Sequence, residues 1–181
     1  MVHFSLVSLS LLSAASLAAA SPTAPTVQRD LTPENFSWER WAESLIADPA
    51  TALSVDEAVA VANQTLSLRK GGQGEKRQED TVRCNDGKPV ASAPDAAWCI
   101  DYLAAKNTDC VTTFATAMCT RGNAQIVGNS NGNRASTYCN NVARTAGKIM
   151  DRCWRADNTV EGAMVAYNQP VMWVFLSGPT I

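Results

Sequence analysis

The residues that could carry chemistry in this chain are cysteines and carboxylates, because histidine is almost absent. The 181 residues include one histidine, His3. A chain that loses its first residues therefore lacks imidazole, and with it Ser-His triads, imidazole proton shuttles and histidine-containing zinc sites. The cysteines all lie between positions 84 and 153; they are Cys84, Cys99, Cys110, Cys119, Cys139 and Cys153.

We expect these six cysteines to form three disulfides rather than a metal site, because small secreted domains commonly depend on disulfides. Six cysteines allow fifteen pairings. Cys139 and Cys153 lie on one predicted helix, 14 residues apart, which separates their Cα atoms by roughly 21 Å at about 1.5 Å per residue. A disulfide requires Cα atoms within about 7 Å, so these two do not pair and twelve pairings remain.

No pair of carboxylates stands out as catalytic. A glycosidase needs two carboxyl groups facing a sugar cleft, roughly 5 to 9.5 Å apart. Asp101 and Asp151 lie on the two predicted helices of the cysteine-containing region, but nothing in their spacing selects them. The loop 129–133 has oxygen-bearing side chains without a carboxylate, so we predict a polar turn before a helix and no calcium site. We predict no catalytic residue, no metal ligand and no cofactor.

The first twenty residues have the organisation of a signal peptide. An apolar stretch from Leu6 to Leu17, interrupted by serines, is followed by alanines that end at Ala20, after which we expect cleavage. The stretch is too short for a membrane anchor, which needs about 18 or more apolar residues. We therefore expect removal of residues 1–20 and a secreted, extracellular product that is not an integral membrane protein.

Residues 21–77 lack cysteine and end in a glycine-rich, charged run that closes with Lys76-Arg77. Such a basic pair is typical of kexin-type cleavage in the late secretory pathway. We predict that 21–77 is a pro-segment and that 78–181 is the mature six-cysteine domain; an uncut basic pair in a linker is the alternative. Two N-glycosylation sequons, at Asn35 and Asn63, also lie in the pro-segment.

Two short amphipathic helices are predicted within the pro-segment. The first carries Trp38 and Trp41 on one face. The second follows Ser54, which forms an S-x-x-E capping box with Glu57. These helices either cover the mature domain during folding or act as a spacer, and the sequence leaves both alternatives open.

The mature domain has the pattern of two helices and two β-hairpins. The helices are predicted at 92–107 and 135–154, and the strands at 111–120, 124–128, 160–167 and 171–176. We therefore predict an α+β fold, a small disulfide-stapled α/β sandwich with two helices on one face of an antiparallel sheet. Cysteines on both helices would join helix to sheet.

Charge and aromatic residues bear on the partners of the mature domain. Residues 78–181 contain nine basic and nine acidic side chains, with no basic stripe, which argues against nucleic acid as a partner. The last predicted strand is apolar on both faces, so Trp173 is either buried or, with Phe175, part of an exposed contact patch. Trp98 and Trp154 present the same alternative between a core position and a contact surface.

The layout of the cysteine-containing region resembles kexin-processed, small secreted cysteine-rich proteins of filamentous fungi. The resemblance rests on the order of three segments, CTRGNAQIVG at 119–128, YCNNVA at 138–143 and EGAMVAY at 161–167. They are similar in layout to the necrosis-inducing apoplastic effector family and to the killer-toxin-like family of smut fungi, whose fold is likewise a small α/β sandwich. The resemblance implies a non-catalytic secreted protein that acts on a host or competitor. The basic and cysteine cluster of the killer toxins' last hairpin is missing here, so no channel-blocking residue is carried over.

We therefore expect a secreted fungal effector, of the virulence or cell-death-inducing type, that binds a host or competitor cell-surface protein or polysaccharide, with the host apoplast as its place of action. A toxin-like antimicrobial protein is one alternative. A small carboxylate-dependent cell-wall hydrolase that uses Asp101 or Asp151 is another, and a carbohydrate-binding or structural cell-wall protein is a third.

The intact mass of the secreted product, measured under denaturing conditions, tests the processing prediction. We expect a chain that begins at Gln78, with or without cyclisation to pyroglutamate, and that lacks six hydrogens relative to its reduced form because its six cysteines are oxidised. The same sample after reduction is the control. A product that begins near Ser21 contradicts cleavage at the basic pair.

Overall fold

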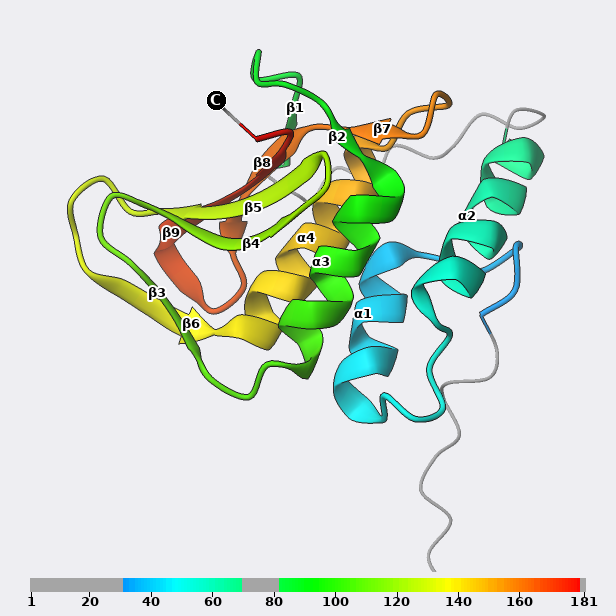
Figure 1. Ribbon diagram of the computed structural model, residues 1–181, viewed down its shortest axis with the longest axis horizontal. Helices are drawn as coiled ribbons and strands as arrows, with labels where there is room; N and C mark the ends of the chain where they lie inside the picture. Colours follow the sequence, from blue (N-terminus) through cyan, green and yellow to red (C-terminus); the bar gives the residue numbers. More distant parts are fainter. Residues whose placement is uncertain (1–30, 70–81, 180–181) are drawn as a thin grey trace, which may run out of the picture.

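A computed structural model describes residues 31–69 and 82–179 and shows three layers (Figure 1). A sheet forms the first layer. Helices α3 (Ala93–Ala105) and α4 (Cys139–Cys153) pack against it, and α1 (Trp38–Ala47) and α2 (Val55–Arg69) form an outer layer against these helices. The predicted mixed α+β fold with disulfides is confirmed, and the described residues contain both the two helices predicted in the pro-segment and the two predicted in the six-cysteine region. The predicted signal peptide with its cleavage site at Ala20 and the predicted processing pair Lys76-Arg77 lie outside the described residues.

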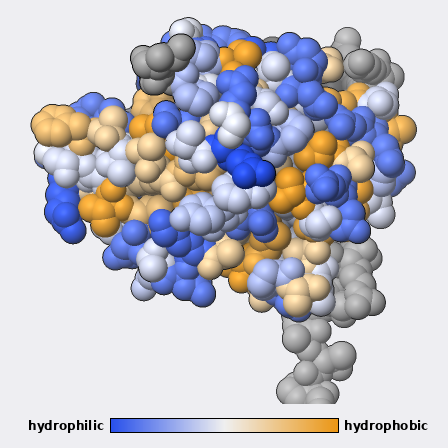
Figure 2. Space-filling model, in the orientation of Figure 1, coloured by the Kyte–Doolittle hydropathy of each residue, from blue (hydrophilic) through white to orange (hydrophobic). Residues whose placement is uncertain are grey.

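The main sheet has five antiparallel strands in the order β1-β8-β9-β5-β4. Their bounds are β1 (Arg83–Cys84), β4 (Ala115–Arg121), β5 (Ala124–Asn129), β8 (Gly162–Ala166) and β9 (Gln169–Ser177). Two further antiparallel pairs join β2 (Ala91–Ser92) to β7 (Thr159–Val160), and β3 (Asp109–Thr112) to β6 (Ala135–Tyr138). On the face of the molecule seen in Figure 2, hydrophilic residues are widespread and hydrophobic ones form small separate groups.

The register of the main sheet separates an inner from an outer face. Cys84, Leu176 and Cys119 lie in one row across the sheet, and disulfides join the two cysteines of this row to α4 and α3. This row therefore belongs to the inner face, which the helices cover. Because successive side chains of a strand point to opposite faces, Trp173 and Phe175 lie on the outer face, where they are half-buried.

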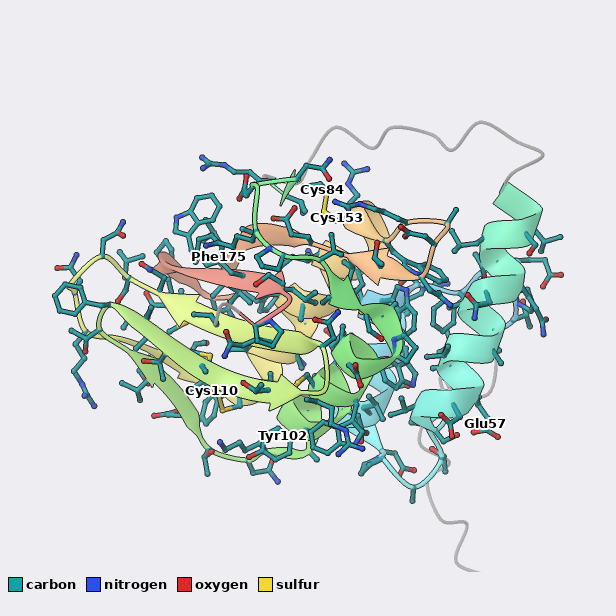
Figure 3. The ribbon with its side chains drawn as sticks, turned by 45° about the horizontal axis from the view of Figure 1, so that its top comes forward. Glu57, Cys84, Tyr102, Cys110, Cys153 and Phe175 are labelled. Atoms are coloured by element: carbon teal, nitrogen blue, oxygen red, sulfur yellow. A yellow bond between two sulfur atoms is a disulfide. The ribbon has the colours of Figure 1, made fainter. Side chains whose placement is uncertain are left out.

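Each disulfide joins a helix to a strand, as predicted. The disulfides are Cys84–Cys153 between β1 and α4, Cys99–Cys119 between α3 and β4, and Cys110–Cys139 between β3 and α4. The two cysteines of α4 lie at its opposite ends and bond to different strands, so the pairing excluded by helix length does not occur. Figure 3 shows the Cys84–Cys153 bond next to the main sheet.

The predicted helix over 135–154 begins too early, because residues 135–138 form strand β6. These residues pair with β3, and the bond from Cys139 to Cys110 ties the start of α4 to the same strand. The polar loop 129–133 therefore leads into a strand and not, as predicted, into a helix.

Two predicted strands are each divided. The stretch 111–120 breaks at Thr113 and Phe114, because β3 leaves the main sheet to pair with β6 while β4 pairs with β5. The stretch 160–167 breaks at Glu161, whose buried carboxylate accepts a hydrogen bond from the backbone nitrogen of Asp86 at 3.0 Å. Composition alone does not reveal either change of partner.

The helices predicted in the first part of the chain are present and belong to the core. The capping box of α2 is confirmed, since Ser54 N donates to Glu57 Oε2 at 2.8 Å and Glu57 N donates to Ser54 Oγ at 3.4 Å. In α1, Trp38 and Trp41 are 1% and 0% exposed. The indole nitrogen of Trp41 donates to the carbonyl of Leu53 at 2.8 Å, whereas that of Trp38 is buried without an acceptor among the described residues.

This difference predicts unequal costs for two matched substitutions, Trp38→Phe and Trp41→Phe. Both remove the same ring volume from the core, but only Trp41→Phe breaks a buried hydrogen bond and leaves the Leu53 carbonyl without its donor. We expect Trp41→Phe to cost about 1–3 kcal/mol more in the free energy of unfolding than Trp38→Phe. Urea unfolding of the full chain measures the difference, and equal losses contradict the assignment.

Candidate functional site

Strand β9 places two aromatic rings on the outer face of the main sheet. The rings of Trp173 and Phe175 have centroids 6.5 Å apart. The register sets Trp173 beside Asn129 of β5, and Phe175 beside Val127 of the same strand. Figure 3 labels Phe175 on β9. The apolar run of the last strand thus supplies core side chains on one face and an aromatic pair on the other.

Two cations lie over these rings. The guanidinium carbon of Arg83 is 4.5 Å from the centroid of the Trp173 ring, and Lys88 Nζ is 5.2 Å from that of Phe175. Neither cation forms an ion pair within the parts of the chain that the structure describes. A guanidinium stacked on an aromatic face keeps its in-plane N–H donors available. Each cation and the ring beneath it therefore present a positive charge in a fixed orientation to solvent.

Two adjoining hollows border the aromatic pair. The first has a volume of about 200 Å³ and is lined by Arg83, Asp86, Asn129, Asn131, Trp173 and Phe175. The second, of about 170 Å³, is lined by Lys88, Ala115, Gln125, Val127, Asn129, Phe175 and Ser177. Both contain Asn129 and Phe175, so they form one shallow depression across β9 and β5, which we call the aromatic groove. Its amide side chains supply hydrogen-bond donors and acceptors.

The loop at one side of the groove is fixed by a buried carboxylate. Glu161 is 2% exposed and accepts from Asp86 N at 3.0 Å, and its Oε2 lies 3.9 Å from Arg155 Nη2. Arg155 also donates to the side-chain oxygen of Asn85. The preceding Cys84 is bonded to α4. These contacts hold the loop that carries Asp86 and Lys88, so this side of the groove is preorganised.

Of the three tryptophans considered as a contact surface, only Trp173 borders the groove. Trp98 stacks on Tyr102, with centroids 5.6 Å apart and planes at 6°, and lies under the guanidinium of Arg121 at 4.8 Å. In Figure 3, Tyr102 is well separated from Phe175, so this α3 stack is distinct from the groove. Trp154 packs edge-on against Trp38 of α1, with centroids 5.5 Å apart.

The two carboxylates considered for hydrolysis are in different situations. Both oxygens of Asp151 accept hydrogen bonds from the backbone of α1, from Trp38 N at 2.7 Å and Glu39 N at 3.0 Å. Asp101 is half-buried on α3, and this burial raises the pKa of its carboxyl. Within residues 31–69 and 82–179, no three His, Cys, Asp or Glu side chains form a group that could hold a metal ion.

The two glycosylation sequons differ in exposure. Asn35 is exposed in the turn before α1, where its side chain accepts a hydrogen bond from Thr32 N at 2.9 Å. Asn63 is half-buried within α2, and Thr65 of its sequon is buried, donating to the carbonyl of Pro33 at 2.9 Å. Asn35 is therefore the more accessible of the two.

Sequence reasoning missed the cations and amides of the groove. Alternation along the last strand places Trp173 and Phe175 on one face, and this signal is readable in the sequence. The positions of Arg83 and Asn129 depend on the pairing order β1-β8-β9-β5, which joins segments more than 40 residues apart. No local pattern encodes that order.

The protein is thus a mixed α+β protein in which disulfides join helices to strands and an aromatic groove lies on the outer face of the main sheet. Residues 79–178 match the family model described as "Domain of unknown function (DUF8794)". The match spans more than half of the chain and includes all six cysteines, so the chain belongs to this family. No curated protein and no solved structure matches the chain. In the described ranges, no helix has the length and apolar character required to cross a membrane.

The raised pKa of Asp101 predicts the effect of Asp101→Asn. Burial disfavours the ionised carboxylate and raises the pKa of Asp101, so at pH values above the pKa of the unfolded carboxyl this residue destabilises the fold relative to a neutral side chain. We expect Asp101→Asn to raise the unfolding midpoint at neutral pH, and the gain to vanish below about pH 3.8, where the unfolded carboxyl is also protonated.

Thermal unfolding over this pH range measures the effect, with exposed Asp109→Asn as the matched control, for which we expect no comparable gain. A loss of stability in Asp101→Asn at neutral pH contradicts the prediction. Release of reducing ends from chitin, glucan or pectin by the wild-type chain, abolished in Asp101→Asn, would instead support a hydrolase.

Proposed function

We propose that this protein is a secreted, non-catalytic effector that acts outside the producing cell by binding a host cell-wall polymer through the aromatic groove. The apolar N-terminal stretch and the Lys76-Arg77 pair support export and processing. Three disulfides support an extracellular place of action. The observation that carries the proposal is the pair of aromatic rings, each covered by a cation without an ion-pair partner among the described residues.

The chemistry of the groove favours a polysaccharide that carries carboxylates. The side-chain N–H groups of Arg83, which have no ion-pair partner among the described residues, suit a carboxylate, which guanidinium binds in bidentate geometry. Lys88 provides a second positive charge across the aromatic pair, and the amides of Asn129 and Gln125 suit hydroxyl groups. The rings of Trp173 and Phe175 are half-buried and lie next to polar side chains, so they also suit a ligand that has both apolar and polar surfaces. A polyuronate combines all of these features.

The proposal includes cleavage of the chain to a mature six-cysteine domain, residues 78–181. Cleavage after Arg77 produces a chain with α3 and α4 as its helices, which corresponds to the sandwich with two helices on one face of the sheet. In this chain, the disulfides hold both helices to the strands. Such a domain presents the groove on the sheet face opposite to the helices, and we propose the host apoplast as its place of action.

Binding of the purified secreted protein to polygalacturonate tests the proposal. We expect wild-type protein to bind this polymer and to bind the fully methyl-esterified polymer weakly, because esterification removes the carboxylate charges. Arg83→Gln should weaken binding about tenfold or more, since a hydrogen bond to a charged group contributes about 1.5–3 kcal/mol. Added salt should weaken wild-type binding.

The matched control is Arg121→Gln, because Arg121 also lies over a tryptophan, at 4.8 Å from the Trp98 ring, but outside the groove. We expect it to bind like wild type, and leaf tissue infiltrated with the two variants should show cell death only with Arg121→Gln. Equal binding by Arg83→Gln and Arg121→Gln contradicts the proposal that the polymer binds in the aromatic groove. No binding by wild type, together with no response in several hosts, contradicts the proposed function.

A further inference from the structure

The described residues 31–69, which we call the helical cap, pack against the six-cysteine domain as part of its core. We propose that the helical cap remains bound to this domain without a covalent link after the chain is cut between α2 and β1, so that the working protein is a two-chain complex. The inference rests on the cleavage included in the proposed function. It extends that function by assigning the cap a permanent structural role.

The N-terminus of α1 is completed by a residue of the six-cysteine domain. The first backbone N–H groups of a helix lack partners within the helix. In α1, Asp151 of α4 accepts from Trp38 N at 2.7 Å and Glu39 N at 3.0 Å, and Ser37 Oγ accepts from Arg40 N at 3.1 Å. A carboxylate in this position also interacts favourably with the helix dipole. Separation would leave two helix donors and a carboxylate to find new partners.

Helix α4 has a second buried stripe, in addition to the one that faces the sheet. Ala143, Gly147 and Met150 follow helical spacing and are buried. A Cβ added at Gly147 would lie 2.8 Å from the carbonyl oxygen of Trp38 and 2.9 Å from Glu39 Cα. The backbone of α1 therefore contacts α4 directly at a residue without a side chain. The six-cysteine domain thus carries a surface fitted to the cap.

Apolar side chains of the cap complete this interface. Trp38 packs edge-on against Trp154 of the six-cysteine domain, and Trp41 and Ala42 are 0% exposed. Contacts from α1 to α3 and from α2 to α3 extend the interface beyond α4. Interfaces that are this apolar resemble a domain core and are typical of permanent complexes rather than transient ones.

Charged pairs border the apolar centre. Arg144 of α4 forms a bidentate contact with Glu43, with its Nε 2.5 Å from Oε1 and its Nη2 3.0 Å from Oε2. Lys148 Nζ lies 3.4 Å from Glu39 Oε1. The cap supplies the acidic partner and α4 the basic partner in both pairs. This arrangement fixes the register of α1 along α4.

The disulfides do not attach the cap, because all six cysteines lie in the other part of the chain. The cap packs on α3 and α4, whereas the aromatic groove lies on the opposite face of the sheet. A retained cap therefore leaves the groove open. It stabilises the helices that support the sheet and does not block the binding site.

Cleavage of the purified full chain tests the inference. The chain is cut with a kexin-type protease, and a second version, with residues 71–75 replaced by the recognition sequence of an unrelated protease, is cut independently of Lys76-Arg77. A denaturing gel confirms complete cutting, after which size-exclusion chromatography and native mass spectrometry detect the complex. We expect both fragments to elute together with their combined mass. Elution of the six-cysteine fragment alone from cut wild type overturns the inference.

Gly147→Ala provides a test whose sign depends on whether the cap is bound. Alanine favours a helix over glycine, so on a free surface it would raise the unfolding midpoint. Against a docked α1 its Cβ collides with the Trp38 carbonyl, so we expect a lower midpoint and at least about tenfold weaker retention of the cap. A raised midpoint in the cut protein contradicts the inference.

Two further variants provide a control for Gly147→Ala and an alternative to it. Leu68→Ala, at an exposed position of the cap, is the control and should retain the cap. If Gly147→Ala is not secreted, Glu43→Gln removes one charge of the pair with Arg144 at the exposed edge and should weaken retention while the chain still folds. Polygalacturonate binding by the cut protein is measured separately, so loss of the cap and failure of the groove give different results.

Discussion

Burial of α4 on two sides is the constraint on which the rest of this structure depends. One stripe of the helix packs on the sheet, and the other accepts α1 at Gly147, where the two backbones meet. Its ends are fixed by disulfides from Cys139 to β3 and from Cys153 to β1. Because Asp151 also completes the N-terminus of α1, this one helix sets the positions of the cap, the edge strand and the sheet.

The disulfide at the end of α4 also sets the geometry of the groove. Strand β1 has two residues, too few for stable pairing on their own. The bond from Cys84 to Cys153 holds this strand against β8, and alternation then turns the neighbouring Arg83 to the outer face over Trp173. A covalent bond on the inner face thus positions a cation on the outer face. Orienting Arg83 before a ligand arrives lowers the entropic cost of binding.

The sequence was sufficient for features that depend on local spacing and insufficient for those that depend on strand pairing. Helix periodicity predicted α3 to within about two residues, and the capping box of Ser54 and Glu57 was readable directly. The start of α4 was misplaced because residues 135–138 gain a distant partner, β3. The aromatic half of the groove follows from alternation in β9, whereas Arg83 and Asn129 join it only through the strand order of the sheet.

The balance of nine basic and nine acidic residues in 78–181 conceals an uneven distribution of charge. On α4, Arg144 and Lys148 are paired with Glu43 and Glu39 of the cap, so their charges are compensated only while the cap is bound. On the opposite side of the molecule, Arg83 and Lys88 lie over aromatic rings and pair with no carboxylate among the described residues. Loss of the cap would therefore uncover a second cationic surface, next to an apolar stripe. A retained cap keeps Arg144 and Lys148 paired, so that this surface of α4 does not compete with the groove for an anionic polymer.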